Sequence, residues 1–324
     1  MGADNGLICA YALDGQGGGR EVGWPEIQAW RAGDGLLWVH LDRTGRESQR
    51  WLRENGGLDP VIAAGLLAED VRPREVPVDD ALLVTLRGVN LNPGADPEDM
   101  VAVRIWLERA RIVTLRHRRL TAINDLREAL VEGRGPRAPG QFLAMLSERL
   151  SARMAPVIDE LVDRIDGLEE AVLQEHRTEL RLGIAGLRRE VIALRRYLAP
   201  QREVVARLTA SHAPWLGAGD RAVLREVADR TTRFVEDLDE ARERAAVVQD
   251  ELNTRLSDQM NRTMYLLTLV ATVLLPPSLI TGLLGVNVGG LPGVEQPWAF
   301  WAMVVALLVL AGVEIVVLRR LRWI

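Results

Sequence analysis

Polar side chains recur every three or four residues over a stretch near the C-terminus of this 324-residue chain. The series comprises Asp250, Thr254, Ser257, Asn261, Thr268, Thr272, Ser278, Thr281 and Gly282, and the apolar Met264 and Leu275 lie between its members. Because an α-helix turns once in about 3.6 residues, this spacing predicts that the series lies along one face of a single helix. Hydroxyl, amide and carboxylate groups suit a hydrated or loosely oxygen-bound metal cation.

The second half of this polar series lies in a segment that is apolar enough to cross a membrane. Residues 264–284 carry no charged side chain, and a membrane-spanning helix needs about 20 such residues. A loop rich in Gly and Pro follows at 285–297, and a second apolar run occupies 298–318 with Glu314 as its one acid. The pattern therefore predicts a two-span hairpin close to the C-terminus.

The charges that flank the two spans predict their orientation. Arg255 and Arg262 precede the first span, and a basic tail at 319–324 follows the second. The loop between the spans contains no Lys or Arg and carries one acid, Glu295. Since cytoplasmic loops are enriched in basic residues, we expect both termini in the cytoplasm and the loop outside, in a bacterial inner (plasma) membrane.

A polar face on a membrane helix needs a partner other than lipid. Exposing such a face to hydrocarbon is costly, and two spans alone cannot enclose a water-filled path. We therefore expect a homo-oligomer in which the first spans of several copies surround a pore. Pro276 and Pro277 remove helix hydrogen bonds in the middle of that span.

The end of the first span resembles a known family. Gly285-Val286-Asn287, followed by a short loop, a second span and a basic tail, resembles the CorA superfamily of divalent-cation transporters, whose signature is Gly-x-Asn. The longer GVNVGGLPG, with AEDVRPR at 68–74 and RRYLAPQREVVARL at 195–208, is similar to the ZntB-type zinc transporter branch. The likeness covers nearly the whole chain, and it implies a CorA-like, funnel-shaped pentamer.

The residues of the hairpin take expected roles in such a pore. An Asn side chain offers an acceptor and donors without net charge, so a ring of Asn287 could hold a cation through its water shell. Glu295 would raise the local cation concentration at the outer mouth, and Asp250 would meet the ion at the other end. The residues expected to line the pore are Gly285, Val286, Gly282, Ser278, Leu275, Thr268, Met264, Asn261 and Ser257.

The remainder of the chain predicts an α+β cytoplasmic domain followed by long helices. Residues 1–137 alternate strand-like runs with helical segments, and one of these helices is expected to be capped by Thr121. Three long helices are expected at 142–176, 179–210 and 220–284. The expected divisions are a domain at 1–137, helices at 138–262, a first span at 263–284, a loop at 285–297, a second span at 298–318 and a tail at 319–324.

An acidic stripe lies on the first of these long helices. It comprises Asp159, Asp163, Asp166 and Glu170, on a face apart from the apolar seam. A charged helix face is most often simply solvated, and that interpretation carries the greater weight here. The alternative is a surface that senses or concentrates cations in the cytoplasm, as acidic residues on comparable helices of CorA-type proteins imply.

Several classes of function have no support in the sequence. A net charge of −5 does not indicate the basic surface that binds nucleic acids. The four histidines and the single Cys9 are scattered along the chain and are not spaced to form a tight zinc site. No cofactor, nucleophile or nucleotide loop is evident, so we expect no enzyme. The resemblance makes zinc the leading cargo, with cadmium, nickel, cobalt or magnesium as further ions and proton coupling left open. A CorA-like magnesium/cobalt channel and a membrane-anchored scaffold or sensor remain as alternatives.

Overall fold

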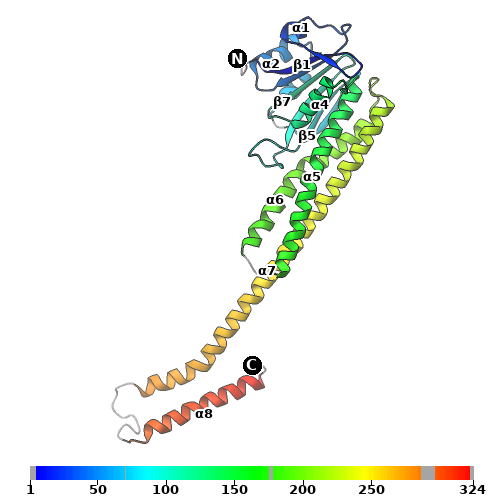
Figure 1. The fold of residues 1–324 in the computed structure, drawn as a ribbon. Coiled ribbons are helices and arrows are strands. Elements are labelled where there is room, and N and C mark those ends of the chain that lie inside the picture. The colour runs from blue at the N-terminus through cyan, green and yellow to red at the C-terminus, as the bar shows by residue number, and fades with distance from the viewer. Residues whose placement is uncertain (1–4, 70, 175–177, 286–295, 322–324) are drawn as a thin grey trace. The chain divides into compact units, whose positions relative to one another are not determined.

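The structure, a computed structural model, describes residues 5–69, 71–174, 178–285 and 296–321. It divides into two compact units, residues 1–249 and 250–324, and Figure 1 shows the helices and strands that they contain. The strands are β1 (Leu7–Leu13), β2 (Gly19–Glu21), β3 (Leu36–Asp42), β4 (Arg74–Val78), β5 (Ala81–Gly88), β6 (Val101–Leu107) and β7 (Arg111–Arg116). The helices are α1 (Trp24–Ala29), α2 (Arg46–Arg50), the π-helix η1 (Trp51–Asn55), α3 (Pro60–Leu67), α4 (Thr121–Val131), α5 (Pro139–Gln174), α6 (Thr178–Thr209), α7 (Ala218–Leu284) and α8 (Ala299–Arg320).

The strands form one seven-stranded sheet in the order β2-β1-β3-β7-β6-β5-β4. Only β3 and β7 run parallel, and all the other neighbours are antiparallel. Parallel neighbours need a long connection, and here the chain between β3 and β7 builds α2, α3 and the hairpins that complete the sheet. A mostly antiparallel sheet with separate helices confirms the expected α+β class.

Side chains alternate in direction along the strands, and both faces of the sheet that they form are buried. In β5, Leu82, Val84 and Leu86 belong to the core shared with α4, α5, α6 and α7. Leu83 points to the opposite face, where a smaller core contains Trp51 of η1 and Leu66 of α3. Successive side chains of a strand point to opposite faces, so a strand covered on both sides is apolar almost throughout. The sheet is therefore the middle layer between short helices and long ones.

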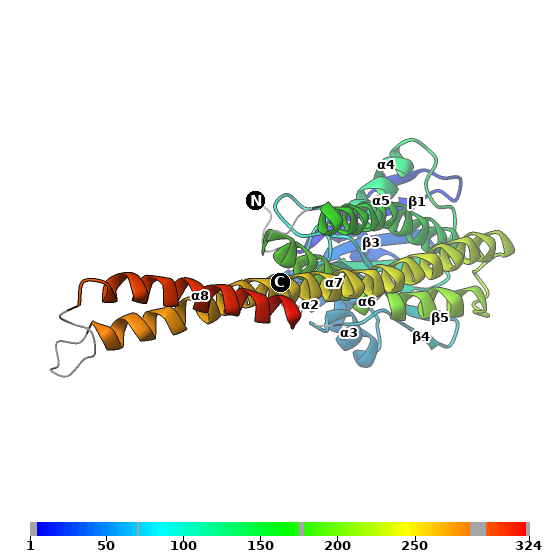
Figure 2. The same ribbon diagram turned by 90° about the horizontal axis from the view of Figure 1, so that it is seen from below.

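The three long helices pack together within the first unit, as the sequence predicts, and Figure 2 shows them along the sheet. The apolar seam of α5 is buried at Ile158, Leu161, Ile165 and Val172. An ion pair also joins each pair of helices. Arg164 of α5 pairs with Glu190 of α6 at 2.6 Å, and Arg195 of α6 pairs with Asp239 of α7. Arg244 of α7 pairs with Asp166 and Glu169 of α5.

Two local expectations differ from the structure. The N-cap of α4 is Leu120, which has no side-chain capping bond, so the prediction that Thr121 caps this helix is wrong. The edge strands β2 and β4 have no strand-like run in the sequence. β2 is only three residues long. β4 contains Pro77, which has no N–H, but an edge strand tolerates it because one side of such a strand makes no hydrogen bonds to a neighbouring strand.

The second unit contains the two apolar helices. Both α7 and α8 are long and apolar enough to cross a membrane, with mean hydropathy of 1.9 and 2.6 in their most apolar windows. In the single chain those windows are 0% and 6% buried, respectively. Such an extent of exposed apolar surface is covered by lipid or by other chains in a working protein.

A side chain of α6 completes the hydrogen bonding of β5. The β4–β5 ladder ends at the pair Arg74 and Thr85, so Arg87 lies beyond the reach of β4. Gln201 takes the place of the missing strand: its Oε1 accepts from the Arg87 N–H at 2.6 Å, and its Nε2 donates to the Arg87 carbonyl at 3.1 Å. Tyr197, one turn earlier, stacks under the Arg87 guanidinium at 3.8 Å.

We expect Gln201→Leu to lower the free energy of unfolding by about 2–4 kcal/mol, because it leaves a buried N–H and a buried C=O without partners. The measurement is thermal and denaturant unfolding of the purified protein. Gln28→Leu, at an exposed position of α1, is the matched control and should change stability little. Equal stability of the two variants would contradict this role for Gln201.

Candidate functional site

The polar series lies on one continuous helix. Every member from Asp250 to Gly282 is exposed in the single chain and belongs to the part of α7 in the second unit. At about 100° per residue, the members from Asp250 to Thr272, the interspersed Met264 and Leu275, and Gly282 stay within about 40° of one line along the helix. Ser278 and Gly285 lie about 80° and 100° to one side of that line, and Thr281 lies about 140° from it. The structure thus supports one polar face through an otherwise apolar segment.

Hydroxyl groups on this helix donate their protons back to their own helix. Thr254 donates to the Asp250 carbonyl at 2.9 Å, and Thr268 donates to the Met264 carbonyl at 2.8 Å. Ser257 donates to the Asn253 carbonyl at 3.0 Å. A hydroxyl has one proton and two lone pairs, so each oxygen is left with acceptor capacity only. A row of acceptors without free protons is suited to cations and their polarised waters.

Apolar side chains interrupt the acceptors. Met264 is 63% exposed and Leu275 is 65% exposed, although both are large and apolar. Gly285 follows the last residue of α7, and its N–H donates to the Thr281 carbonyl at 2.9 Å. The predicted roles of Val286, Asn287 and Glu295 concern positions outside the described residues.

The acidic stripe of α5 is partly engaged. Asp166 and Glu169 share Arg244, which neutralises part of the stripe, while Asp159 and Asp163 are exposed. Asp159 and the α7 residues Asp237 and Glu240 line a hollow of about 250 Å³. Burial, and then Glu240 and Asp159, raise the pKa of Asp237. Among the residues described, no three acidic, His or Cys side chains are grouped so that they could hold a metal. A cation-sensing role for the stripe stays a prediction.

Two of the side chains that could bind zinc, Cys9 and His40, are buried in the sheet, whereas His117 and His212 are exposed. Cys9 and His40 are paired across β1 and β3, and burial raises the pKa of the Cys9 thiol to about 11. Burial, helped by Arg116 and Arg127, lowers the pKa of His40 to about 3. The His40 Nδ1 is 2.8 Å from the Thr114 hydroxyl, and its Nε2 is buried without a hydrogen-bond partner. Both groups are therefore neutral at pH 7 and belong to the core.

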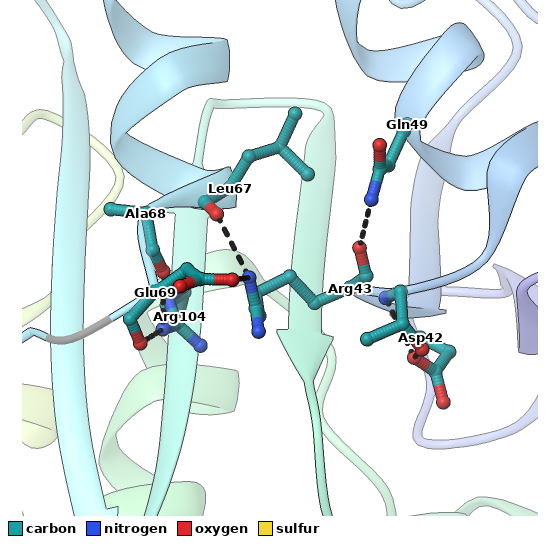
Figure 3. Close-up of polar contacts among 8 residues, drawn as sticks. Asp42, Arg43, Gln49, Leu67, Ala68, Glu69 and Arg104 are labelled. Atoms are coloured by element: carbon teal, nitrogen blue, oxygen red, sulfur yellow. Dashed lines mark hydrogen bonds and ion pairs between the residues drawn. The ribbon is translucent and has the colours of Figure 1, made fainter.

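Arginines donate to the backbone carbonyls of Leu67, Ala68, Glu69 and Val71, a role that sequence reasoning missed. Figure 3 shows Arg43 donating to the Leu67 carbonyl and Arg104 donating to the carbonyls of Ala68 and Glu69. The last two bonds measure 2.6 Å and 3.0 Å. From another strand, Arg87 reaches the Val71 carbonyl at 2.8 Å. Three arginines from different parts of the sheet thus fix one short loop, and no local sequence signal connects them.

Comparison with known proteins identifies the relatives of this chain. A family model described as "CorA-like Mg2+ transporter protein" matches residues 33–320. The chain is 42% identical to a divalent cation transporter, CmaX, of Pseudomonas aeruginosa, over 99% of this chain and 98% of that protein. It is 36% identical to a zinc transport protein, ZntB, of Pectobacterium carotovorum, over 98% of this chain and 96% of that protein.

Solved structures share the architecture. The structure of full-length CmaX matches with a TM-score of 0.86 and 40% sequence identity, over 100% of both chains. The CorA magnesium transporter from Methanocaldococcus jannaschii matches with a TM-score of 0.79 over 98% of this chain and 99% of that one. At 21% identity the second match shows the fold alone. An α+β domain, long helices and two apolar C-terminal helices are thereby confirmed as a CorA-like fold.

The buried His40 predicts a specific pH dependence of stability. In the unfolded chain its pKa is about 6.5, so that state binds the proton more tightly than the folded state does. Stability should therefore fall as the pH drops through the range from 6.5 towards 3, by about 2 kcal/mol between pH 6.5 and 5. Thermal unfolding of wild-type and His40→Gln protein at pH 7 and 5 measures this. An equally large loss in the variant would show that other groups cause it.

Proposed function

This chain belongs to the CorA-like Mg2+ transporter family, and we propose that it carries divalent cations across a membrane through a pore formed by the first spans of a homo-oligomer. The polar series on α7 is the observation that carries this proposal. Lipid cannot hydrogen-bond to the polar groups on one face of this apolar helix, whereas copies arranged around an axis would turn that face into the lining of a water-filled path. The family is one of transporters rather than of enzymes.

Zinc is the proposed leading cargo. Relatives with 36% identity over nearly the whole chain are named zinc transport proteins, and the CmaX relative is named a divalent cation transporter. The membrane-spanning part of α7 offers hydroxyl oxygens and contains no His or Cys. Oxygen ligands of this kind discriminate weakly, so cadmium, nickel, cobalt and magnesium are proposed as competing ions. A magnesium/cobalt channel is the alternative.

The proposed path has three parts. At the outer mouth, rings of Asn287 and Glu295 would attract the cation and hold it through its water shell. Along the span, Met264 and Leu275 would form apolar constrictions between the hydroxyl-bearing levels. Asp250 would give the ion a carboxylate at the opposite end of the series. Weak contact at each level suits an ion that has to leave as readily as it enters.

Assembly and location complete the proposal. We expect a pentamer in a bacterial inner membrane, with both termini in the cytoplasm. The charge pattern supports this orientation, because Arg319 and Arg320 end α8 and Arg255 and Arg262 lie on α7 before the apolar segment.

The first prediction of this proposal concerns the number of copies. The exposed apolar windows and polar series of the second unit require neighbours, so the purified protein in detergent should be an oligomer, with five copies as the expected number. Mass photometry together with a flux assay on the same preparation measures this. A stable monomer that transports cations would exclude the shared pore.

The second prediction concerns transport itself. Purified protein in liposomes should move zinc, and zinc and magnesium uptake with and without an imposed pH gradient would define the cargo and any proton coupling.

Asn287→Ala should lower uptake at least tenfold, because it removes the polar ring at the mouth. Gln296→Ala, which truncates an exposed amide of the same loop, is the matched control and should transport normally. Wild-type uptake by an assembled Asn287→Ala protein would count against the site, and no uptake by wild-type protein would favour a membrane-anchored scaffold.

A further inference from the structure

Two consecutive prolines lie inside the apolar part of α7. The helix runs unbroken from Ala218 to Leu284 and includes Pro276 and Pro277. A proline has no N–H, so the helical bonds that would end on the carbonyls four residues earlier cannot form. The carbonyl oxygens of Thr272 and Val273 therefore lose their helical partners in the middle of the span.

Side-chain hydroxyls of the helix do not replace the missing donors. Ser and Thr often satisfy carbonyls that a proline frees in membrane helices. Here the Thr272 hydroxyl donates to the Thr268 carbonyl at 2.8 Å, and the Thr281 hydroxyl donates to the Pro277 carbonyl at 3.0 Å. No hydroxyl bond described along α7 ends on Thr272 O or Val273 O. An unsatisfied carbonyl in hydrocarbon costs several kcal/mol, so such a group is tolerated where water or protein reaches it.

The two freed carbonyls lie on different faces of the helix. Thr272, a member of the polar series, is four residues after Thr268 and three before Leu275, so it lies on the polar face. Val273 lies about 100° further round the helix than Thr272. The N–H that would bond its carbonyl is absent because residue 277 is a proline, and Pro277 is on the side of the helix opposite the series. Only the carbonyl of Thr272 therefore opens on the flank of the polar face.

We propose that Thr272 forms a second permeation site in mid-span, in which its freed carbonyl oxygen and its hydroxyl oxygen accept hydrogen bonds from the waters of a hydrated divalent cation. This inference rests on the proposed transport function and adds a residue and a ligand class to it. The hydroxyl proton is already committed to Thr268, so both oxygens present lone pairs alone. Repeated in each copy, they make a ring of acceptors between the constrictions at Met264 and Leu275.

The two prolines supply a matched pair of variants. Pro276→Ala restores the N–H that satisfies Thr272 O, and Pro277→Ala restores the one that satisfies Val273 O. Each variant removes one proline ring from the same turn, so effects on helix bending are shared. The assay is the initial rate of zinc uptake into liposomes by oligomers of confirmed size. Thr272→Val, which removes the hydroxyl oxygen and keeps the shape of the side chain, is the third variant.

We expect Pro276→Ala to lower uptake about tenfold, Pro277→Ala to lower it less than twofold, and Thr272→Val to fall between them. Equal loss in both proline variants would show that helix bending matters and not the carbonyl, and would overturn the inference. Unchanged uptake in Pro276→Ala would overturn it as well. In either case zinc uptake by the wild-type protein leaves the transport function standing, whereas a wild-type protein that moves no cation overturns both.

Discussion

A helix that crosses hydrocarbon has to satisfy its own polar groups, and that requirement organises the membrane part of this chain. The hydroxyls of α7 meet it by donating to carbonyls one turn back, as Thr268 and Thr272 do. The same bonds determine what the helix offers to its surroundings, because the protons turn inward and the lone pairs remain outside. A row of threonines and serines thus presents oxygens that accept hydrogen bonds, and a cation with its water shell is the matching ligand.

Backbone polar groups of the sheet domain also find hydrogen-bond partners, and these come from distant parts of the chain. The side of Arg87 that β4 does not reach is completed by Gln201, and the carbonyls of Ala68 and Val71 accept hydrogen bonds from arginines. Deeper in the core, Cys9 and His40 are held neutral by burial. The one cysteine and one of the four histidines are thus part of the packing. The proposed path in the membrane span offers oxygen groups instead.

Much of this architecture could be predicted from sequence because its signals are local. The two spans follow from unbroken hydropathy, the long helices from an apolar seam every three or four residues, and the family from the Gly285-Val286-Asn287 tripeptide with its flanking span. Contacts between distant segments have no such signal. Gln201 and Arg87 are 114 residues apart, and Arg244 and Asp166 are 78 apart. The error at Thr121 is also instructive, since a Thr at a helix start can occupy the first turn without capping it.

The two edges of the sheet have a consequence for how the protein is made. An exposed edge strand is a template for pairing with another chain, and unpaired strand edges are prone to aggregate while chains are still folding. Here one edge, β2, has only three residues, and the other, β4, carries Pro77 and the charged Arg74 and Glu75. Neither edge can readily add a strand from a nascent neighbour, so the sheets of newly made copies are protected against fusing into a continuous aggregate.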